Sequence, residues 1–217
     1  MTYRDNPCIL YIMNRGDTKM INTFKDLQNR FNSIAHKKHT VRSTSHGAVG
    51  ELFEKLMIGR VVGTQKGADF VSINTEAKVH YSSTNLVTIF SYRGKGIDPR
   101  DVTELRGRSY AKMGDGIVEK NGNICIAHNG KILCVWSISD LEARITEKMT
   151  NLAIVKATKT GNKVTYNKMT VCRKLIPSRF IESIRKGDVK IETRHSRNAT
   201  QFRASYSVIE EWFEVLH

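Results

Sequence analysis

The sequence predicts a mixed α/β fold, of the α+β kind. Apolar residues at spacings of three and four predict amphipathic helices, the first over residues 21–35. Between Gly116 and Trp136, apolar strands alternate with Asn121-Gly122 and Asn129-Gly130, the residue pairs favoured in two-residue hairpin turns. Helices and strands follow one another without a linker or internal repeat, so we expect a single domain over residues 1–217.

The charge balance indicates a polyanionic partner. Lys and Arg number 35 against 21 Asp and Glu, which gives a formal net charge of +14. A domain this basic usually binds phosphates, because neutralising them releases condensed counterions. The alternative is a basic surface without any such partner.

The lengths of the apolar runs and the spacing of the cysteines indicate in which cellular compartment we expect the protein. No apolar run is long enough to cross a bilayer, and no signal peptide is visible, so we expect a cytoplasmic, reduced protein. The four cysteines show no CxxC spacing, which argues against a zinc site. A turn at Asn129-Gly130 would place Cys125 opposite Cys134, where either a disulfide or two buried thiols would fit; a reduced cytosol favours the thiols.

Further elements follow from periodicity and turn residues. A helix capped by Ser45 should run to Gly59, one capped by Ser139 should run to about Met149, and one should open at Pro177 and close before Gly187. The polar link 36–46 is either a solvated loop or an arm along a phosphate backbone. The expected strands are 68–73 and 74–81 as a hairpin, 86–90, 152–156, 164–168, 189–194 and 202–205, before a closing helix over 207–215.

Three carboxylates and a lysine lie on the helix that should end at Gly59 and on the two expected strands that follow it. In the strand 74–81 the period of two puts Glu76, Lys78 and His80 on one face. Asp69 precedes this strand, and Glu54 lies nearer than Glu51 to the buried stripe of its helix. The carboxylates of Asp69, Glu76 and Glu54 would form the oxygen-only site that magnesium prefers. The Lys78 ammonium could then reach an attacking water or a phosphate. The alternative is a surface Glu-Lys pair, which would contribute almost nothing.

The order and spacing of these carboxylates, the lysine and the glycines before them resemble those of a known family. The run Gly47-Ala-Val-Gly50, Glu54, Ala68-Asp69-Phe70 and Glu76-x-Lys78 resembles the MvaI/BcnI-type restriction endonucleases, in the MutH-like branch of the PD-(D/E)xK nucleases. The similarity extends over roughly residues 44–215. It includes Leu86-Val-Thr-Ile-Phe90, Pro99-Arg100, Leu105-Arg106-x-Arg108-x-Tyr110, Val135-Trp136-Ser137, Gly187-Asp188-Val-Lys190 and Phe202-Arg203.

The resemblance implies a restriction-endonuclease-like core, in which helices flank a central mixed sheet, and a DNA-recognition lobe. A catalytic lobe would span about 20–110 with parts of the sheet, and the recognition lobe would lie largely within 111–217. Residues 1–19 would be a loosely attached extension. Such an enzyme is expected to be a monomer with one active site that cleaves double-stranded DNA at a short sequence, and a methyltransferase acting on the same site is a further expected partner.

The resemblance also implies roles for individual residues. Asp69 and Glu76 correspond to Mg²⁺ ligands, with Mn²⁺ expected to substitute, Lys78 to the catalytic lysine, and Glu54 to the glutamate on the helix. The C-terminal part would read bases, because arginine forks suit guanine edges. The expected DNA contacts are Arg194, His195, Arg197, Asn198, Arg203, Arg106, Arg108 and His80.

Other functions fit parts of the same pattern. Within the nucleases, the chain could be a MutH-like nickase or a mobile-element nuclease of low specificity. A DNA-binding protein with a nuclease fold but no turnover is the alternative from another class, and intact Asp69, Glu76 and Lys78 argue against it. An RNA-binding protein would need an aromatic strand platform for base stacking, which this sequence lacks.

Overall fold

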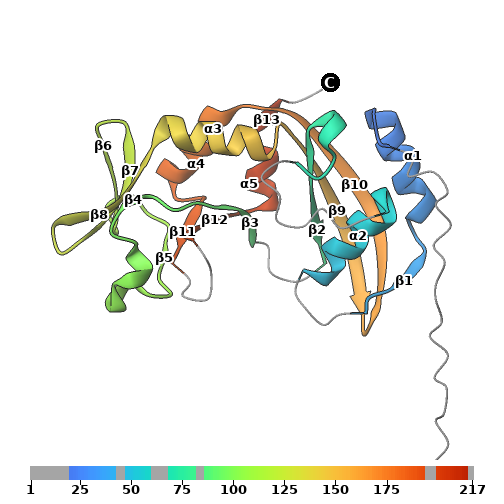
Figure 1. Ribbon diagram of the computed structural model, residues 1–217, viewed down its shortest axis with the longest axis horizontal. Coiled ribbons are helices and arrows are strands. Elements are labelled where there is room, and N and C mark those ends of the chain that lie inside the picture. Colours follow the sequence, from blue (N-terminus) through green and yellow to red (C-terminus); the bar gives the residue numbers. More distant parts are fainter. Residues whose placement is uncertain (1–19, 43–46, 60–67, 82–85, 194–198, 215–217) are drawn as a thin grey trace, which may run out of the picture.

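The computed structural model describes residues 20–42, 47–59, 68–81, 86–193 and 199–214. They form an elongated molecule with two lobes side by side (Figure 1). No helix in these ranges is long and apolar enough to cross a membrane.

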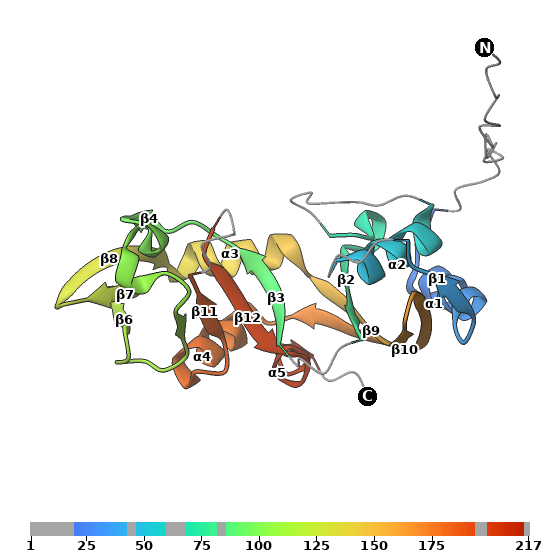
Figure 2. The ribbon, with the colours of Figure 1, turned by 90° about the horizontal axis from the view of Figure 1, so that it is seen from below.

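The first lobe is a five-stranded mixed sheet with two helices on one face. The strand order is β1 (Lys38–Thr40), β10 (Lys163–Leu175), β9 (Asn151–Thr160) and β2 (Thr75–His80), and β13 (Phe213–Glu214) pairs with the end of β10. The β2–β9 pair is parallel, whereas β9–β10 and β1–β10 are antiparallel. Helices α1 (Phe24–Ile34) and α2 (Ala48–Ile58) lie together over this sheet in both views (Figures 1 and 2).

The second lobe contains two four-stranded sheets. One has the order β3 (Leu86–Ser91), β12 (Gln201–Ser205), β11 (Lys190–Glu192) and β5 (Ser109–Tyr110), and the other has the order β4 (Lys95–Gly96), β8 (Lys131–Ser137), β7 (Asn123–His128) and β6 (Ile117–Lys120). Helices α3 (Ile138–Lys148), α4 (Pro177–Lys186) and α5 (Tyr206–Glu210) belong to this side of the molecule (Figure 1). The short helices η1 (Val71–Ile73), η2 (Pro99–Asp101) and η3 (Thr103–Leu105) complete the described elements.

Each lobe has its own apolar core, and β9 contributes to both. Leu152 and Ile154 lie in the larger core with α3 and α4, whereas Ala153 and Val155 lie in the smaller core with α1 and α2. The segment 86–110, expected in the catalytic lobe, contributes buried side chains such as Phe90 to the larger core. The mixed α+β architecture is therefore as predicted, and the lobes are joined through one sheet.

The helices expected from periodicity are present, but some caps differ. Helix α1 lies within the predicted range 21–35 and buries Leu27, Phe31 and Ile34, and α2 ends at Gly59 in a left-handed conformation. The N-cap of α2 is Gly47 rather than Ser45, which lies outside the described residues. Ser137, not Ser139, caps α3 by accepting from the Asp140 N–H at 3.0 Å.

Helix α4 has the predicted bounds, whereas helix α5 is shorter than predicted. Helix α4 opens at Pro177 and ends at Gly187, as predicted. The closing helix α5 is shorter than the expected 207–215, because the chain leaves it after Glu210 and pairs with β10 as β13. That strand places Phe213 in the larger core.

The β-meander is confirmed, but its register is shifted by one residue. Asn121, Gly122, Asn129 and Gly130 all have positive φ, as the tight hairpin turns require. An irregularity between Ile126 and Ala127 nevertheless pairs Cys125 with Val135 rather than with Cys134. The prediction of opposed cysteines was wrong for this reason, and both are buried free thiols.

Two local assignments around the first lobe also differ. Residues 71–73 form η1 rather than a strand, so the expected hairpin reduces to a single bridge between Phe70 and Thr75. Within the polar link 36–46, residues 38–40 form β1 at the edge of the sheet.

Candidate active site

The turn before β2 brings Asp69 beside that strand. Asn74 adopts a left-handed conformation, with φ 44°, and reverses the chain so that Phe70 and Thr75 exchange two backbone hydrogen bonds. Asp69 then accepts a hydrogen bond through Oδ2 from the Ala77 N–H at 2.8 Å. Asp69 is 8% exposed, so a carboxylate is buried against the outer edge of β2.

Strand β2 supplies Glu76 and Lys78 from one face, as its period of two predicted. Ala77 and Val79 pack against the smaller core on the other face. The Lys78 Nζ lies 2.6 Å from Glu76 Oε1. The Glu76 carboxylate is only 2% exposed, whereas Lys78 is 21% exposed and therefore retains access to solvent.

A second lysine, which the sequence pattern did not predict, completes the pairing of Glu76. The Lys148 Nζ, from the last turn of α3, lies 2.9 Å from Glu76 Oε2. Strand β9 begins three residues later and runs parallel to β2, with Asn151 opposite Thr75, so the end of α3 lies beside the start of β2. The sequence shows that a strand begins shortly after Lys148. It does not show that this strand runs parallel to β2, which is what brings Lys148 to Glu76.

The charges of this group act on one another. Burial, and secondarily the negative charge of Glu76, raise the pKa of Asp69 to about 6. Glu54 acts in the same direction, while the Ala77 N–H and Lys78 oppose it. Burial alone would lower the pKa of Lys78, but Glu76, Asp69 and Glu54 more than offset it and the pKa is raised. The four predicted residues therefore form one electrostatic cluster.

The oxygen atoms of the cluster suit a hard cation, but the described side chains are not already arranged around a metal position. Asp69, Glu76 and Glu54 offer oxygen ligands only. Burial first, and the neighbouring carboxylates second, raise the pKa of Asp69, and a divalent ion beside it would favour the ionised form. Within the described ranges, no group of three or more His, Cys, Asp or Glu side chains is arranged to hold a metal ion. Both oxygens of Glu76 instead face lysine nitrogens, so an ion would have to compete with Lys148.

Four of the eight predicted DNA contacts fall within the described residues, namely Arg106, Arg108, His80 and Arg203. Arg194, His195, Arg197 and Asn198 lie outside the described residues. Arg106 and Arg108 are exposed, and the Arg106 Nε–H donates to the Arg100 carbonyl at 2.9 Å.

His80 and Arg203 are both engaged within the protein. The His80 ring stacks on the Tyr206 ring with centroids 4.6 Å apart. Arg203 donates through Nη1 to Glu192 Oε1 at 2.9 Å and through Nη2 to the Leu86 carbonyl at 3.1 Å. The Arg203 side chain is 15% exposed, so a contact with a base would require this pair to open.

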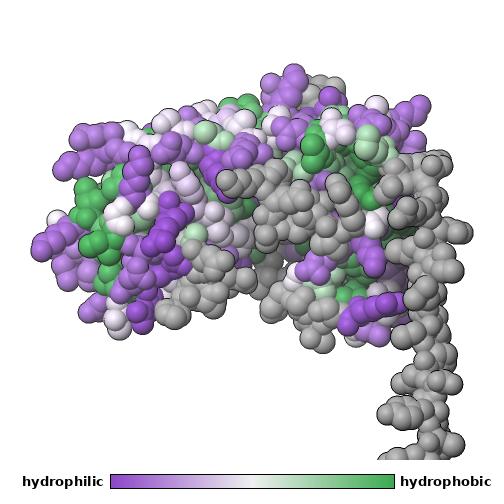
Figure 3. Space-filling view, viewed as in Figure 1, coloured by the Kyte–Doolittle hydropathy of each residue, from purple (hydrophilic) through white to green (hydrophobic). Residues whose placement is uncertain are grey.

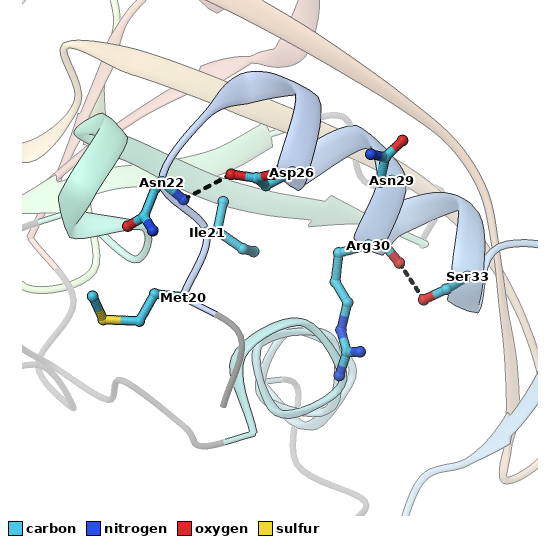
Figure 4. A pocket seen from close by; sticks show the side chains of 7 residues that line it. All are labelled: Met20, Ile21, Asn22, Asp26, Asn29, Arg30 and Ser33. Atoms are coloured by element: carbon cyan, nitrogen blue, oxygen red, sulfur yellow. Dashed lines mark hydrogen bonds between the residues drawn. The ribbon is translucent and has the colours of Figure 1, made fainter. Parts of the chain in front are cut away.

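A hollow beside α1 is separate from the cluster. Its walls come from the start of the chain that the structure describes and from α1, and none of its lining residues belongs to the carboxylate group (Figure 4). Arg30 lines it and donates through Nε to the Leu56 carbonyl near the end of α2 at 3.1 Å. Arg30 therefore ties the two helices of the first lobe together.

The fold is that of a restriction endonuclease. In particular, the structure is similar to the restriction endonuclease MvaI in its complex with cognate DNA, with a TM-score of 0.64 and 19% sequence identity over 88% of this chain and 94% of that chain. A structure of MvaI in the absence of DNA aligns with a TM-score of 0.47 and 15% identity, over 89% of this chain and 96% of that one. No protein-family model and no curated protein matches the sequence.

Asp69 should destabilise the protein above pH 6 when no metal is present. Its folded-state pKa of about 6 exceeds the ordinary value of 3.8, so its stabilising contribution is present at low pH and is lost as the pH rises through 6. Asp69→Asn removes the charge and keeps an oxygen for the Ala77 N–H. At about pH 8 the free energy of unfolding should rise by up to about 3 kcal/mol. Urea unfolding in a chelator, repeated below about pH 4, should show the gain disappearing. A loss of stability at both pH values would contradict this account.

Removing Arg203 should strongly destabilise the fold, since the buried Glu192 would lose the guanidinium that donates to both of its carboxylate oxygens. We expect Arg203→Ala to lower the free energy of unfolding by about 3–5 kcal/mol. The double variant Arg203→Met with Glu192→Leu should recover most of that loss, because neither charge then remains. Denaturant unfolding measures both. A stability loss of less than about 1 kcal/mol in the single variant would mean that the pair is effectively solvated.

Proposed function

We propose that this protein is a Mg²⁺-dependent endonuclease that hydrolyses phosphodiester bonds of double-stranded DNA at a short recognition sequence. The proposal is carried by one observation, the convergence of Asp69, Glu76 and Lys78 at the start of β2, with Glu54 acting on them from α2. Support also comes from the fold and from the charge of +14, which favours a phosphate-bearing partner. MvaI itself is known in a complex with cognate DNA.

In this proposal the carboxylates of Asp69, Glu76 and Glu54 hold the metal. When bound, the ion would act as a Lewis acid on the scissile phosphate and would lower the pKa of the water that it coordinates. Asp69 must lose its proton before it can act as a ligand, and its pKa of about 6 leaves it ionised at neutral pH. Apparent Mg²⁺ affinity should therefore fall as the pH drops through 6.

Lys78 has a separate role, which follows from its charge. The neighbouring carboxylates raise its pKa, so the ammonium remains protonated at neutral pH. A protonated lysine cannot accept a proton from water, and its part is to stabilise negative charge that develops on the phosphate. Its partial exposure leaves it accessible to a substrate.

Lys148 neutralises Glu76 from the opposite side. One lysine ammonium contacts each oxygen of the buried Glu76 carboxylate, so the pairing is complete without a metal. We infer that Lys148 keeps the site preformed.

Activity assays on plasmid DNA with Mg²⁺ test the proposal. Wild-type protein should give linear DNA with discrete ends, whereas open circles alone would indicate the MutH-like nicking alternative. Lys78→Ala should lower the cleavage rate by at least about 100-fold while duplex binding survives, because the lost charge acts mainly in the transition state. Asp69→Ala should also abolish cleavage. Full activity in both variants would remove the proposed site.

Helix α2 offers a matched pair of glutamates for a second test. Glu54 is half-buried and acts electrostatically on Asp69 and Lys78, whereas Glu51, one turn away, is exposed. Glu54→Gln should raise the Mg²⁺ concentration needed for half-maximal cleavage by roughly tenfold, since one oxygen ligand loses its charge. Glu51→Gln should leave that concentration unchanged. Equal effects in the two variants would mean that Glu54 is no closer to the metal than any surface charge.

A further inference from the structure

One face of the sheet that carries Glu76 and Lys78 continues as an array of lysines and small polar residues. We call it the lysine face. Its members are exposed or half-buried, and the opposite face of the same strands packs against α1 and α2. The lysine face consists of Lys38, Thr40, Lys156, Thr158, Lys163, Thr165, Asn167 and Lys168.

Strand register connects this face to the candidate active site. Side chains of β9 alternate, and Ala153 and Val155 point into the smaller core. Lys156 therefore points the other way. It lies directly opposite His80 on β2, one two-residue step beyond Lys78.

A β-bulge adds a second lysine to the same row. Val164 and Tyr166 of β10 point into the smaller core, so strict alternation would send Lys168 there as well. The register shift between Tyr166 and Lys168 inserts Asn167, and Lys168 is exposed and opposite Lys156. The Asn167 Nδ2–H donates to Thr158 Oγ1 at 2.8 Å, which holds the bulged residue on the lysine face.

The charges on this face lack compensation within its own strands. Strands β1, β9 and β10 contain no Asp or Glu. Like charges directly opposite each other on neighbouring strands are destabilising, and Lys156 and Lys168 form such a pair. A partner with closely spaced negative charges would remove this repulsion, and its phosphates could also accept hydrogen bonds from the threonine hydroxyls.

We propose that the lysine face binds the phosphate backbone of duplex DNA beyond the candidate active site. Strands about 4.8 Å apart and a two-residue step of about 6.6 Å place the Cα of Lys168 roughly 12 Å from that of Lys78. A duplex that presents a phosphate to Lys78 carries further phosphates over that distance. This inference deepens the proposed function and rests on it for the identity of the polyanion.

The salt dependence of binding tests the lysine face. The double variant Lys156→Gln with Lys168→Gln keeps side-chain length and removes two charges. Fluorescence anisotropy with a labelled duplex of random sequence, in a chelator, measures affinity between about 50 and 200 mM salt. The slope of log affinity against log salt should become shallower by about 1.8, and affinity near 0.1 M should fall on the order of 50-fold.

Lys159→Gln is the matched control. Lys159 lies on the same strand but on the opposite face, where its Nζ is 5.8 Å from the centre of the Tyr81 ring. This variant should keep the wild-type slope. An unchanged slope in the double variant, or an equal change in the control, would overturn the assignment of the lysine face.

Cleavage measured in parallel separates the two proposals. Wild-type cleavage combined with an unchanged slope in the double variant would reject the lysine face and leave the nuclease intact. A wild-type protein that never cleaves, but whose slope still depends on Lys156 and Lys168, would reject the proposed function and keep the face as a polyanion surface.

Discussion

A buried carboxylate held between two ammonium groups is the interaction on which the centre of this molecule depends. An isolated ionised glutamate cannot be removed from water without a large penalty, and Glu76 is almost fully buried. Lys78 offsets that penalty from the same strand and Lys148 offsets it from α3. The parallel pairing of β2 with β9 makes this geometry, because it brings the end of α3 to the start of β2.

Around Glu76, Lys78 and Lys148, other charged groups of the protein are only partly compensated by their neighbours. Asp69 is driven toward protonation by burial and by Glu76, and Lys156 faces Lys168 on the same sheet. The first imbalance calls for a cation and the second for an anion. In the function proposed above, a complex of metal ion and DNA would supply both at neighbouring points of the one sheet.

Local patterns in the sequence predicted much of this arrangement, and non-local pairing was what they could not predict. The period of two in β2 placed Glu76 and Lys78 together correctly, since that relation depends on one strand only. Lys148 was missed because its position follows from a parallel register. The β-branched residues of η1 are typical of a strand, but the left-handed Asn74 turns the chain there. The internal pairing of Arg203 likewise depends on two strands that meet in the fold.

Strand β9 has a consequence for how the protein unfolds. Successive side chains of this strand belong alternately to the larger and the smaller core, so neither core is complete without it. If one core unfolded, the β9 side chains that belong to the other core would lose their support. The two lobes should therefore unfold in a single cooperative transition. Glu76 and Lys78 lie on β2, whose parallel pairing with β9 ties the candidate site to the strand that the two cores share.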